Sequence, residues 1–325
     1  MSRRYLVCVG IAIILLAALL FFNTMRHSEA LTVSVTTTVE PEVTPSAVPT
    51  LIPAPSASLE KEAESAQVSV YQYDSDSLRV SVLYTHVLSS ETYLTSIWMQ
   101  DPGKQIRKAT STFHENLGTA PELAALLPEA KVIINGSGYV SPIYPEIPDN
   151  YPGTSADYYY TALGSVTVTD GTVLRCLSGV PYYGLTLQAD GLHLHVGDDP
   201  DAVLAAAPSQ TWSFYELCPM IQDGEIILDT SWAFARRKAI RTIISLLPDG
   251  TYLLLSTESM TLVDAAQYLQ DTYHPVWTYD LDGGPSSALF VHSDAANAPH
   301  LVFGARQPIV DVMGFYDLED LPPAP

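Results

Sequence analysis

Four of the five Asp-Gly pairs, those that lie before residue 277, constrain the fold of this chain more than any other feature, and each is flanked by short apolar runs. An Asp-Gly pair supplies the positive φ that tight hairpin turns need, so each pair predicts two adjacent antiparallel strands. The pairs are Asp170-Gly171, Asp190-Gly191, Asp223-Gly224 and Asp249-Gly250. The apolar runs have the length of strands and lie at residues 78–84, 93–99, 132–134, 165–169, 185–187, 226–228, 243–247, 252–255 and 301–303.

Two segments instead have the apolar spacing of helices. Residues 121–127 follow Thr119, and residues 262–272 follow Thr261, and both threonines are suitable N-caps. The sequence therefore predicts an α+β fold, with a mixed, largely antiparallel β-sheet core and a few flanking helices. Each helix precedes a buried strand and then a Gly-rich loop, at residues 131–138 and 276–284. Ligand sites often form where such strands end.

The first 67 residues differ from the rest. Residues 5–22 form an apolar run without charge. This run is long enough for a transmembrane helix, which needs about 17–25 residues. We expect residues 1–27 to be a single-pass membrane anchor, with the remainder outside the cytoplasm; a cleaved signal peptide is the alternative. Residues 28–67 are rich in Pro, Thr and Ser and predict a disordered stalk. Residues 68–325 are long enough for one globular domain.

The formal net charge of −21 argues against nucleic acid as a partner, because a phosphate backbone requires a basic face. Within this acidic chain one segment is basic, and this basic cluster contains Arg236, Arg237, Lys238 and Arg241. In a strand, Arg237 and Arg241 would share a face and could bind phosphate or carboxylate. A solvated edge strand is the alternative. The spacings His-x-x-x-His and Cys-x-x-Cys do not occur, so the sequence predicts neither a metal site nor a cofactor.

Residues 277–290 carry the most distinctive pattern. They predict a strand, a Gly-rich turn and a second strand, with Asp280 and Asp282 on one face of the first strand. Gly283 and Gly284 allow close approach of a ligand, and two serines follow them. Two carboxylates beside a possible anion cradle suit a site that holds a phosphate or a sugar. An ordinary hairpin or strand-end turn is the alternative. The loop 139–160 holds six tyrosines, which either stack on carbohydrate or simply pack the loop.

Several motifs in order resemble the phosphodiester glycosidase family over about residues 130–315. They are Ile-Asn-Gly-Ser-Gly-Tyr at 134–139, Leu-Gly-Ser-Val-Thr-Val-Thr-Asp-Gly at 163–171, Pro-Met-Ile-Gln-Asp-Gly at 219–224, Arg-Thr-Ile-Ile-Ser-Leu-Leu-Pro-Asp-Gly at 241–250, Met-Thr-Leu at 260–262 and Tyr-Asp-Leu-Asp-Gly-Gly-Pro-Ser-Ser at 279–287. The sequence departs from the family pattern at Ser137, Ser245, Asp280 and Pro285, and Ser-Thr-Glu-Ser at 256–259 stands where the family has Asp-Gly-Arg.

The resemblance implies an extracytoplasmic hydrolase of a sugar-1-phosphodiester, of the N-acetylglucosamine type, acting on envelope polysaccharide or exopolysaccharide. It implies that Asp282 is nucleophile or general base, that Asp280 is a second carboxylate, and that Arg241 neutralises the phosphate. The residues expected to bind substrate are Asn135, Gly136, Thr242, Gly283, Gly284, Ser286 and Ser287. The alternative is a non-catalytic cell-surface glycan-binding module on the same fold. It is favoured by the tyrosine loop, by Ser245 and by Pro285, which removes a backbone N–H from the turn.

Overall fold

The structure is a computed structural model that describes residues 67–321 except 144, 148–149, 215 and 217. The predicted anchor and nearly all of the predicted stalk lie outside these residues. No helix of the described part is both long and apolar enough to span a membrane. Within it, every pair of named strands is antiparallel, which confirms the predicted largely antiparallel core.

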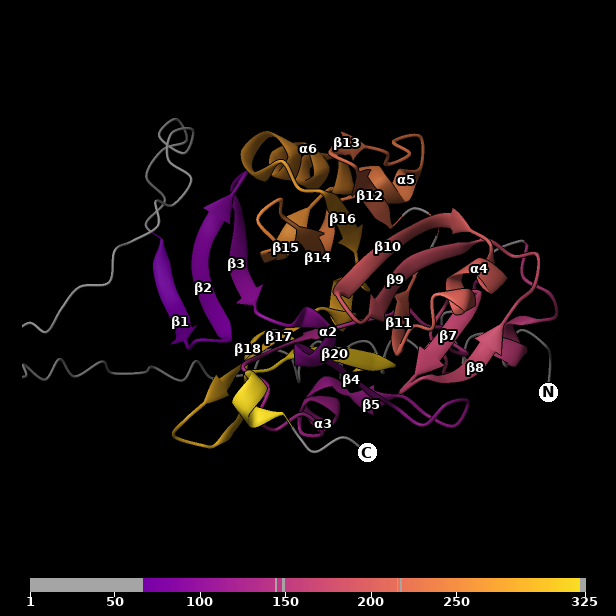
Figure 1. Ribbon diagram of the computed structural model, residues 1–325. Coiled ribbons are helices and arrows are strands. Elements are labelled where there is room, and N and C mark those ends of the chain that lie inside the picture. The colour runs from indigo at the N-terminus through magenta and orange to yellow at the C-terminus, as the bar shows by residue number, and fades with distance from the viewer. Residues whose placement is uncertain (1–66, 144, 148–149, 215, 217, 322–325) are drawn as a thin grey trace, which may run out of the picture. The chain divides into compact units, whose positions relative to one another are not determined.

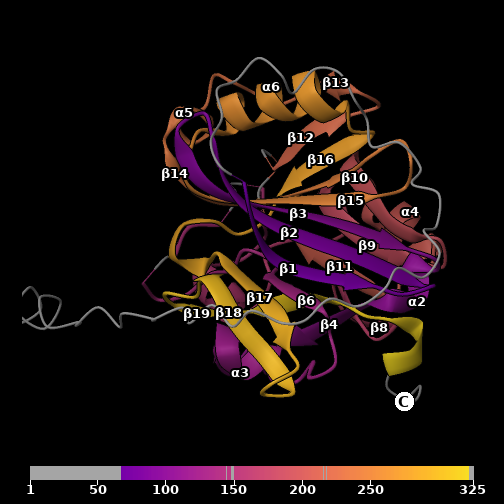
Figure 2. The ribbon, with the colours of Figure 1, turned by 90° about the vertical axis from the view of Figure 1, so that its left-hand side faces the viewer.

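The largest sheet has eight strands (Figures 1 and 2). In spatial order they are β1 (Val68–Asp74), β2 (Leu78–Val87), β3 (Ser90–Met99), β15 (Tyr252–Met260), β14 (Ala239–Leu246), β16 (Trp277–Asp280), β12 (Pro219–Gln222) and β13 (Glu225–Ile226). Helix α6 (Leu262–Tyr273) covers one face, and its buried residues include Leu262 and Leu269 as the periodicity predicts. Both faces of this sheet are buried at β14. Successive residues of a strand point to opposite faces, so Ile243 packs with α6 and Ile244 packs on the opposite side.

A second sheet of five strands packs against that opposite side (Figure 1). Its order is β18 (Ala298–Gly304), β17 (Ala288–Ser293), β6 (Val132–Asn135), β20 (Asp311–Phe315) and β4 (Ile106–Thr110). Helix α3 (Ala120–Ala124) packs on its outer face through Leu123 and Ala124. The layers therefore run helix, sheet, sheet, helix.

The remaining elements form a smaller sheet, two ribbons and several short helices. A three-stranded sheet contains β10 (Gly191–Asp198), β9 (Tyr182–Gln188) and β11 (Gln210–Ser213). Two ribbons pair β7 (Val166–Thr169) with β8 (Thr172–Cys176), and β5 (Gly118–Thr119) with β19 (Pro308–Ile309). The short helices are α2 (Pro102–Gln105), α4 (Pro200–Ala205), α5 (Ala233–Arg236), η2 (Ser155–Tyr158), η3 (Gly284–Ser286) and η4 (Leu318–Asp320).

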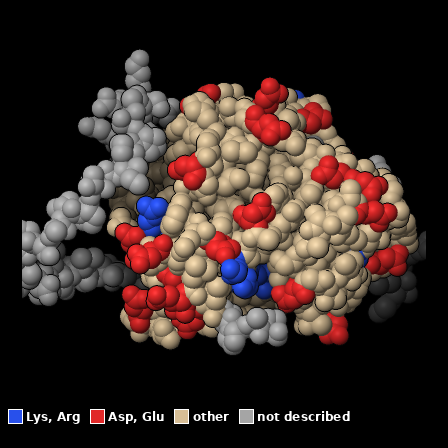
Figure 3. All heavy atoms as spheres, in the orientation of Figure 1, with Lys and Arg blue, Asp and Glu red and all other residues tan. Residues whose placement is uncertain are grey.

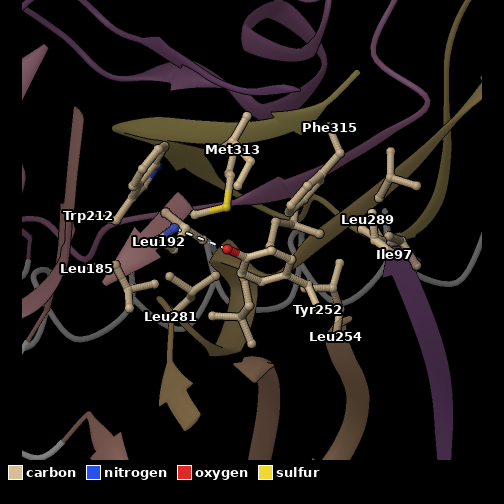
Figure 4. Packing of buried hydrophobic residues seen from close by; sticks show 14 of the residues in the cluster. Ile97, Leu185, Leu192, Trp212, Tyr252, Leu254, Leu281, Leu289, Met313 and Phe315 are labelled. Atoms are coloured by element: carbon tan, nitrogen blue, oxygen red, sulfur yellow. Dashed lines mark hydrogen bonds between the residues drawn. The ribbon is translucent and has the colours of Figure 1, made fainter. Parts of the chain in front are cut away.

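The main core lies where the three larger sheets meet (Figure 4). Leu254 of the eight-stranded sheet, Phe315 of the five-stranded sheet and Trp212 of the three-stranded sheet all contribute to it. The hydroxyl of Tyr252 accepts a hydrogen bond from the backbone N–H of Leu192 at 3.1 Å, so this buried polar group is satisfied. Apolar packing within this core holds the two larger sheets face to face, which brings the ends of their central strands together.

Most sequence-based expectations for individual elements are confirmed. Each of the four Asp-Gly pairs predicted to form hairpin turns joins two paired antiparallel strands. Helix α3 begins after Thr119 but ends at Ala124, earlier than predicted, while α6 matches its prediction within one residue. The predicted strand at 226–228 contributes only Ile226 to β13.

The basic cluster contains one wrong prediction. Arg237 follows helix α5 and precedes β14, so it does not share a strand face with Arg241. Arg237 is exposed, whereas only 1% of Arg241 is exposed. Figure 3 shows that basic side chains are few on the visible face and that acidic side chains are spread over it, as the net charge implies. Among the described residues, Cys176 is exposed, Cys218 is buried, and neither forms a disulfide bond.

Candidate active site

The candidate site forms where β6 of one sheet and β16 of the other end side by side. The backbone N–H of Asp282, just after β16, donates to the carbonyl of Gly136, just after β6, at 3.0 Å. After this turn the chain enters β17, which belongs to the five-stranded sheet. The Asp-Gly-Gly segment is therefore a connection between sheets, and the alternative of a hairpin between paired strands is excluded.

Asn135 ties this junction together. Its Nδ2 donates to the carbonyl of Asp282 at 2.6 Å, and its Oδ1 accepts from the Thr242 hydroxyl at 2.9 Å and from the backbone N–H of Ala288 at 2.8 Å. The side chain is fully buried, so each bond replaces one that water can no longer supply. Asn135 thus joins β6, β14, β17 and the Gly-rich turn.

Arg241 and Asp280 form a second buried connection. Nη1 of Arg241 lies 3.3 Å from Oδ2 of Asp280, and both side chains are at most 1% exposed. The guanidinium also donates to the carbonyls of Phe234, Arg237 and Met260. These four hydrogen bonds leave Arg241 one of its five N–H hydrogens.

A cavity of about 360 Å³ opens beside these residues. It is lined by Tyr139, Ile143, Pro145, Glu146, Phe214, Phe234, Arg237, Ala239, Arg241, Asp282, Gly283, Gly284, Pro285 and Gln307. Of the predicted site residues, Arg241, Asp282 and the two glycines reach its wall. The others are buried outside the lining: Asn135, Gly136, Thr242, Asp280, Ser286 and Ser287. The placement of Asp280 differs from that expected of a second carboxylate facing substrate, because its side chain lies behind the cavity wall against Arg241.

Asp282 is the carboxylate best placed for proton transfer. It is 9% exposed and lines the cavity. Burial raises its pKa from 3.8 to about 7, although the Ser286 hydroxyl and the Gly283 N–H act in the opposite direction. Burial likewise raises the pKa of Asp280 to about 7, with Arg241 acting in the opposite direction. A group with a pKa near neutrality can exchange protons efficiently at that pH.

A buried ion pair supports the other half of the junction. Nζ of Lys108 lies 2.9 Å from Oδ2 of Asp311, with side chains 1% and 0% exposed. Oδ1 of Asp311 accepts from the backbone N–H of Ser137 at 2.6 Å. A Cβ on Gly136 would collide with the same carboxylate, so only glycine fits there. The pair therefore fixes the loop that follows β6.

The sequence did not identify every residue that lines the cavity. Arg237 stood out only as a member of the basic cluster, and Glu146 carried no signal because it lies in a proline-rich loop away from any motif. Phe214 and Phe234 form an edge-to-face pair, with ring centroids 6.4 Å apart. The described residues contain no group of three or more His, Cys, Asp or Glu side chains arranged to hold a metal ion.

The two raised carboxyl pKa values predict a pH dependence of stability. A carboxyl with a higher pKa in the folded state binds its proton more tightly there, so its contribution is complete below pH 4 and is lost as pH rises towards about 7. Asp282→Asn removes one of these groups. Between pH 4 and 7 the free energy of unfolding should fall for the wild type and for this variant. The fall should be smaller for the variant, and the difference between the two should be on the order of 3 kcal/mol.

Urea denaturation at a series of pH values measures this difference. Asp223→Asn is the control, since Asp223 is exposed on a hairpin turn and Asn tolerates its positive φ of 51°. Its curve should run parallel to that of the wild type. A parallel curve for Asp282→Asn as well would show that burial does not raise the pKa of Asp282.

Comparisons with known proteins agree with this architecture. The phosphodiester glycosidase family model matches residues 128–316. The catalytic domain of zebrafish N-acetylglucosamine-1-phosphodiester alpha-N-acetylglucosaminidase, auto-inhibited by its pro-peptide, has a similar fold, with a TM-score of 0.56 and 15% identity over 77% of this chain and 87% of that one. No curated protein sequence matches the chain.

Two further solved structures are more distant. A hypothetical protein from Synechocystis has a TM-score of 0.45 and 14% identity, covering 74% of this chain and 62% of its own. A putative exported protein from Burkholderia pseudomallei has a TM-score of 0.43 and 12% identity, covering 70% and 74%. Because the family model matches more than half of the 325 residues, this chain belongs to the phosphodiester glycosidase family and is a hydrolase of the glycosidase type.

Proposed function

We propose that this protein is an extracytoplasmic hydrolase of a sugar-1-phosphodiester, of the N-acetylglucosamine-1-phosphodiester type, acting on envelope polysaccharide or a related glycan. The observation that carries the proposal is Asp282, a carboxyl with a raised pKa at the wall of a cavity that also contains arginine. The name of the zebrafish enzyme with the similar fold supports the substrate class.

The chemistry of this substrate favours a base over an acid. When the bond between the anomeric carbon and the bridging oxygen breaks, its electron pair stays on a phosphate monoester, whose second pKa is about 6. Such a leaving group needs little protonation. The incoming oxygen needs activation instead, so the carboxylate of Asp282 either accepts a proton from the attacking water or attacks the anomeric carbon itself. Both roles use the ionised form of Asp282.

The neighbouring buried residues act on the reaction through position. Asp280 holds the Arg241 guanidinium, and that guanidinium places a fixed positive charge at the cavity wall. Asn135 donates to the carbonyl of Asp282 and is itself held by the hydroxyl of Thr242, so these two residues fix where the Asp282 side chain begins. A Cβ on Gly283 would lie only 2.9 Å from the carbonyl oxygen of Ile240, so the turn has little space for a larger residue.

The departures from the family pattern have different consequences in the structure. The hydroxyl of Ser245 pairs with that of Thr278 at 2.8 Å, and both residues lie outside the cavity lining. Ser245 therefore places no side chain in the cavity wall. Pro285 does line the cavity, and its carbonyl accepts from the backbone N–H of Arg306 at 3.0 Å. Pro285 is therefore the departure that favours the second candidate function, a glycan-binding module without hydrolysis.

One assay separates the two functions. Purified full-length protein is incubated with an N-acetylglucosamine-1-phosphodiester, and released sugar and phosphomonoester are measured in parallel. We expect equimolar release of both products. Saturable binding of the diester without release would support the binding module and would exclude hydrolysis of this substrate class. The proposed location rests on the uncharged run at residues 5–22, and protease accessibility of the domain in intact cells tests it.

A further inference from the structure

The cavity needs a group that neutralises the substrate phosphate, and Arg241 is poorly placed to do so alone. It is 1% exposed and already donates four hydrogen bonds to Asp280 and to three backbone carbonyls. A bidentate contact to a phosphate needs two free N–H groups on one edge of the guanidinium, and only one hydrogen remains.

The Gly-rich turn and the acidic side chains of the lining do not supply this group. The Gly283 N–H already faces the carboxylate of Asp282. Asp282 and Glu146 are themselves carboxylates on the cavity wall, and each repels an anion when ionised. A phosphodiester would therefore meet two acidic side chains and one nearly saturated cation. A further accessible cation is required for favourable binding.

Arg237 fulfils this requirement. Its side chain is exposed, lines the same cavity, and has no carboxylate within ion-pair distance among the described residues. Its guanidinium carbon lies 5.7 Å from the centroid of the Phe234 ring. The guanidinium of Arg241 lies 4.5 Å from the same ring, so Phe234 contacts both arginines.

The backbone of Arg237 is fixed by Arg241. Nη2 of Arg241 donates to the Arg237 carbonyl at 3.0 Å, and the Arg237 N–H donates to the carbonyl of Phe234 at 3.3 Å. We propose that Arg237 binds the phosphate of the substrate and that Arg241 is a positioning residue that holds Arg237 at the cavity. This assignment rests on the proposed function, because it is that function which places a phosphodiester in the cavity.

Arg237→Ala tests the assignment with Arg236→Ala as its matched control. Arg236 is the neighbouring exposed arginine, but its side chain donates to the Ser231 carbonyl and does not line the cavity. With the sugar-1-phosphodiester, Arg237→Ala should raise KM about 10- to 100-fold, the range expected for loss of a hydrogen-bonded ion pair. Arg236→Ala should stay within about twofold of the wild type. Arg237→Lys should recover part of the loss, because lysine keeps the charge without the bidentate geometry.

Calorimetric titration of the wild type, Arg237→Ala and Arg236→Ala with N-acetylglucosamine-1-phosphate separates this inference from the proposed function. One outcome is that the wild type hydrolyses the diester and that Arg237→Ala and Arg236→Ala have the same KM and the same affinity for the ligand. This outcome would overturn the role of Arg237 and leave the proposed function intact. A second outcome is that the wild type binds the ligand, Arg237→Ala does not, and neither protein hydrolyses the diester. This outcome would support the anion site and exclude hydrolysis of this substrate class. Absence of both binding and turnover in the wild type would overturn both proposals.

Discussion

Replacing Asp282 with asparagine is expected to lower kcat/KM for a sugar-1-phosphodiester by about 10²–10⁴-fold, the range for loss of a general base. The amide keeps the shape of the side chain but cannot accept a proton at neutral pH. Because the pKa of Asp282 is about 7 and its ionised form is the active one, wild-type kcat/KM should fall as pH is lowered through about 7. Initial rates of sugar release from pH 5 to 9 measure both effects.

Asp294→Asn provides the control for this experiment. The Asp294 side chain is fully exposed and lies outside the cavity lining, so its loss should leave the rates and the pH profile unchanged. Retention of more than a tenth of wild-type kcat/KM by Asp282→Asn would contradict the assigned role. A wild-type profile that instead rises as pH falls below 7 would show that the protonated form acts.

Lys108→Met is expected to lower the free energy of unfolding by about 3–5 kcal/mol, because it leaves Asp311 buried without its partner cation. Lys108 and Asp311 are 1% and 0% exposed at a distance of 2.9 Å, so solvent can replace little of the lost interaction. The Lys108 ammonium also donates to the Thr211 carbonyl at 2.7 Å. Urea denaturation at pH 7 measures the change.

Lys104→Met is the matched control, since it removes the same charge from an exposed pair. Lys104 is 69% exposed and lies 2.7 Å from Asp101, and pairs of this kind contribute about 0–1 kcal/mol. Adding Asp311→Asn to Lys108→Met should recover part of the stability, because the uncompensated charge is then removed. Similar losses in Lys104→Met and Lys108→Met would show that burial does not strengthen the inner pair.

Local sequence determined much of the secondary structure. Four Asp-Gly pairs predicted hairpins because few other dipeptides adopt the required turn. Successive residues of a strand point to opposite faces, so Ile243 of β14 faces α6 and Ile244 faces the second sheet. Thr119 and Thr261 predicted the two main helix starts because their hydroxyls accept backbone N–H groups there.

The motif residues of the candidate site were also identified from sequence, but their arrangement was not. Asp280 and Asp282 are two positions apart on the chain, and this spacing predicted that both would lie on one face of a strand. The tertiary structure separates them, because β16 ends at Asp280, leaving it buried against Arg241, while Asp282 in the following turn reaches the cavity. Strand length and sheet packing decide this difference, and neither is encoded in two residues.

The sequence by itself determined that strands, turns and a few capped helices would form, since these depend on contacts between near neighbours along the chain. Only the tertiary structure decided that Asn135 and Asp282, which are 147 positions apart, share a hydrogen bond, and that Arg237 and Glu146 line the same cavity as Asp282. The physical reason is that two separate sheets must pack face to face before their strand ends meet, and that packing depends on the whole buried core rather than on any local pattern.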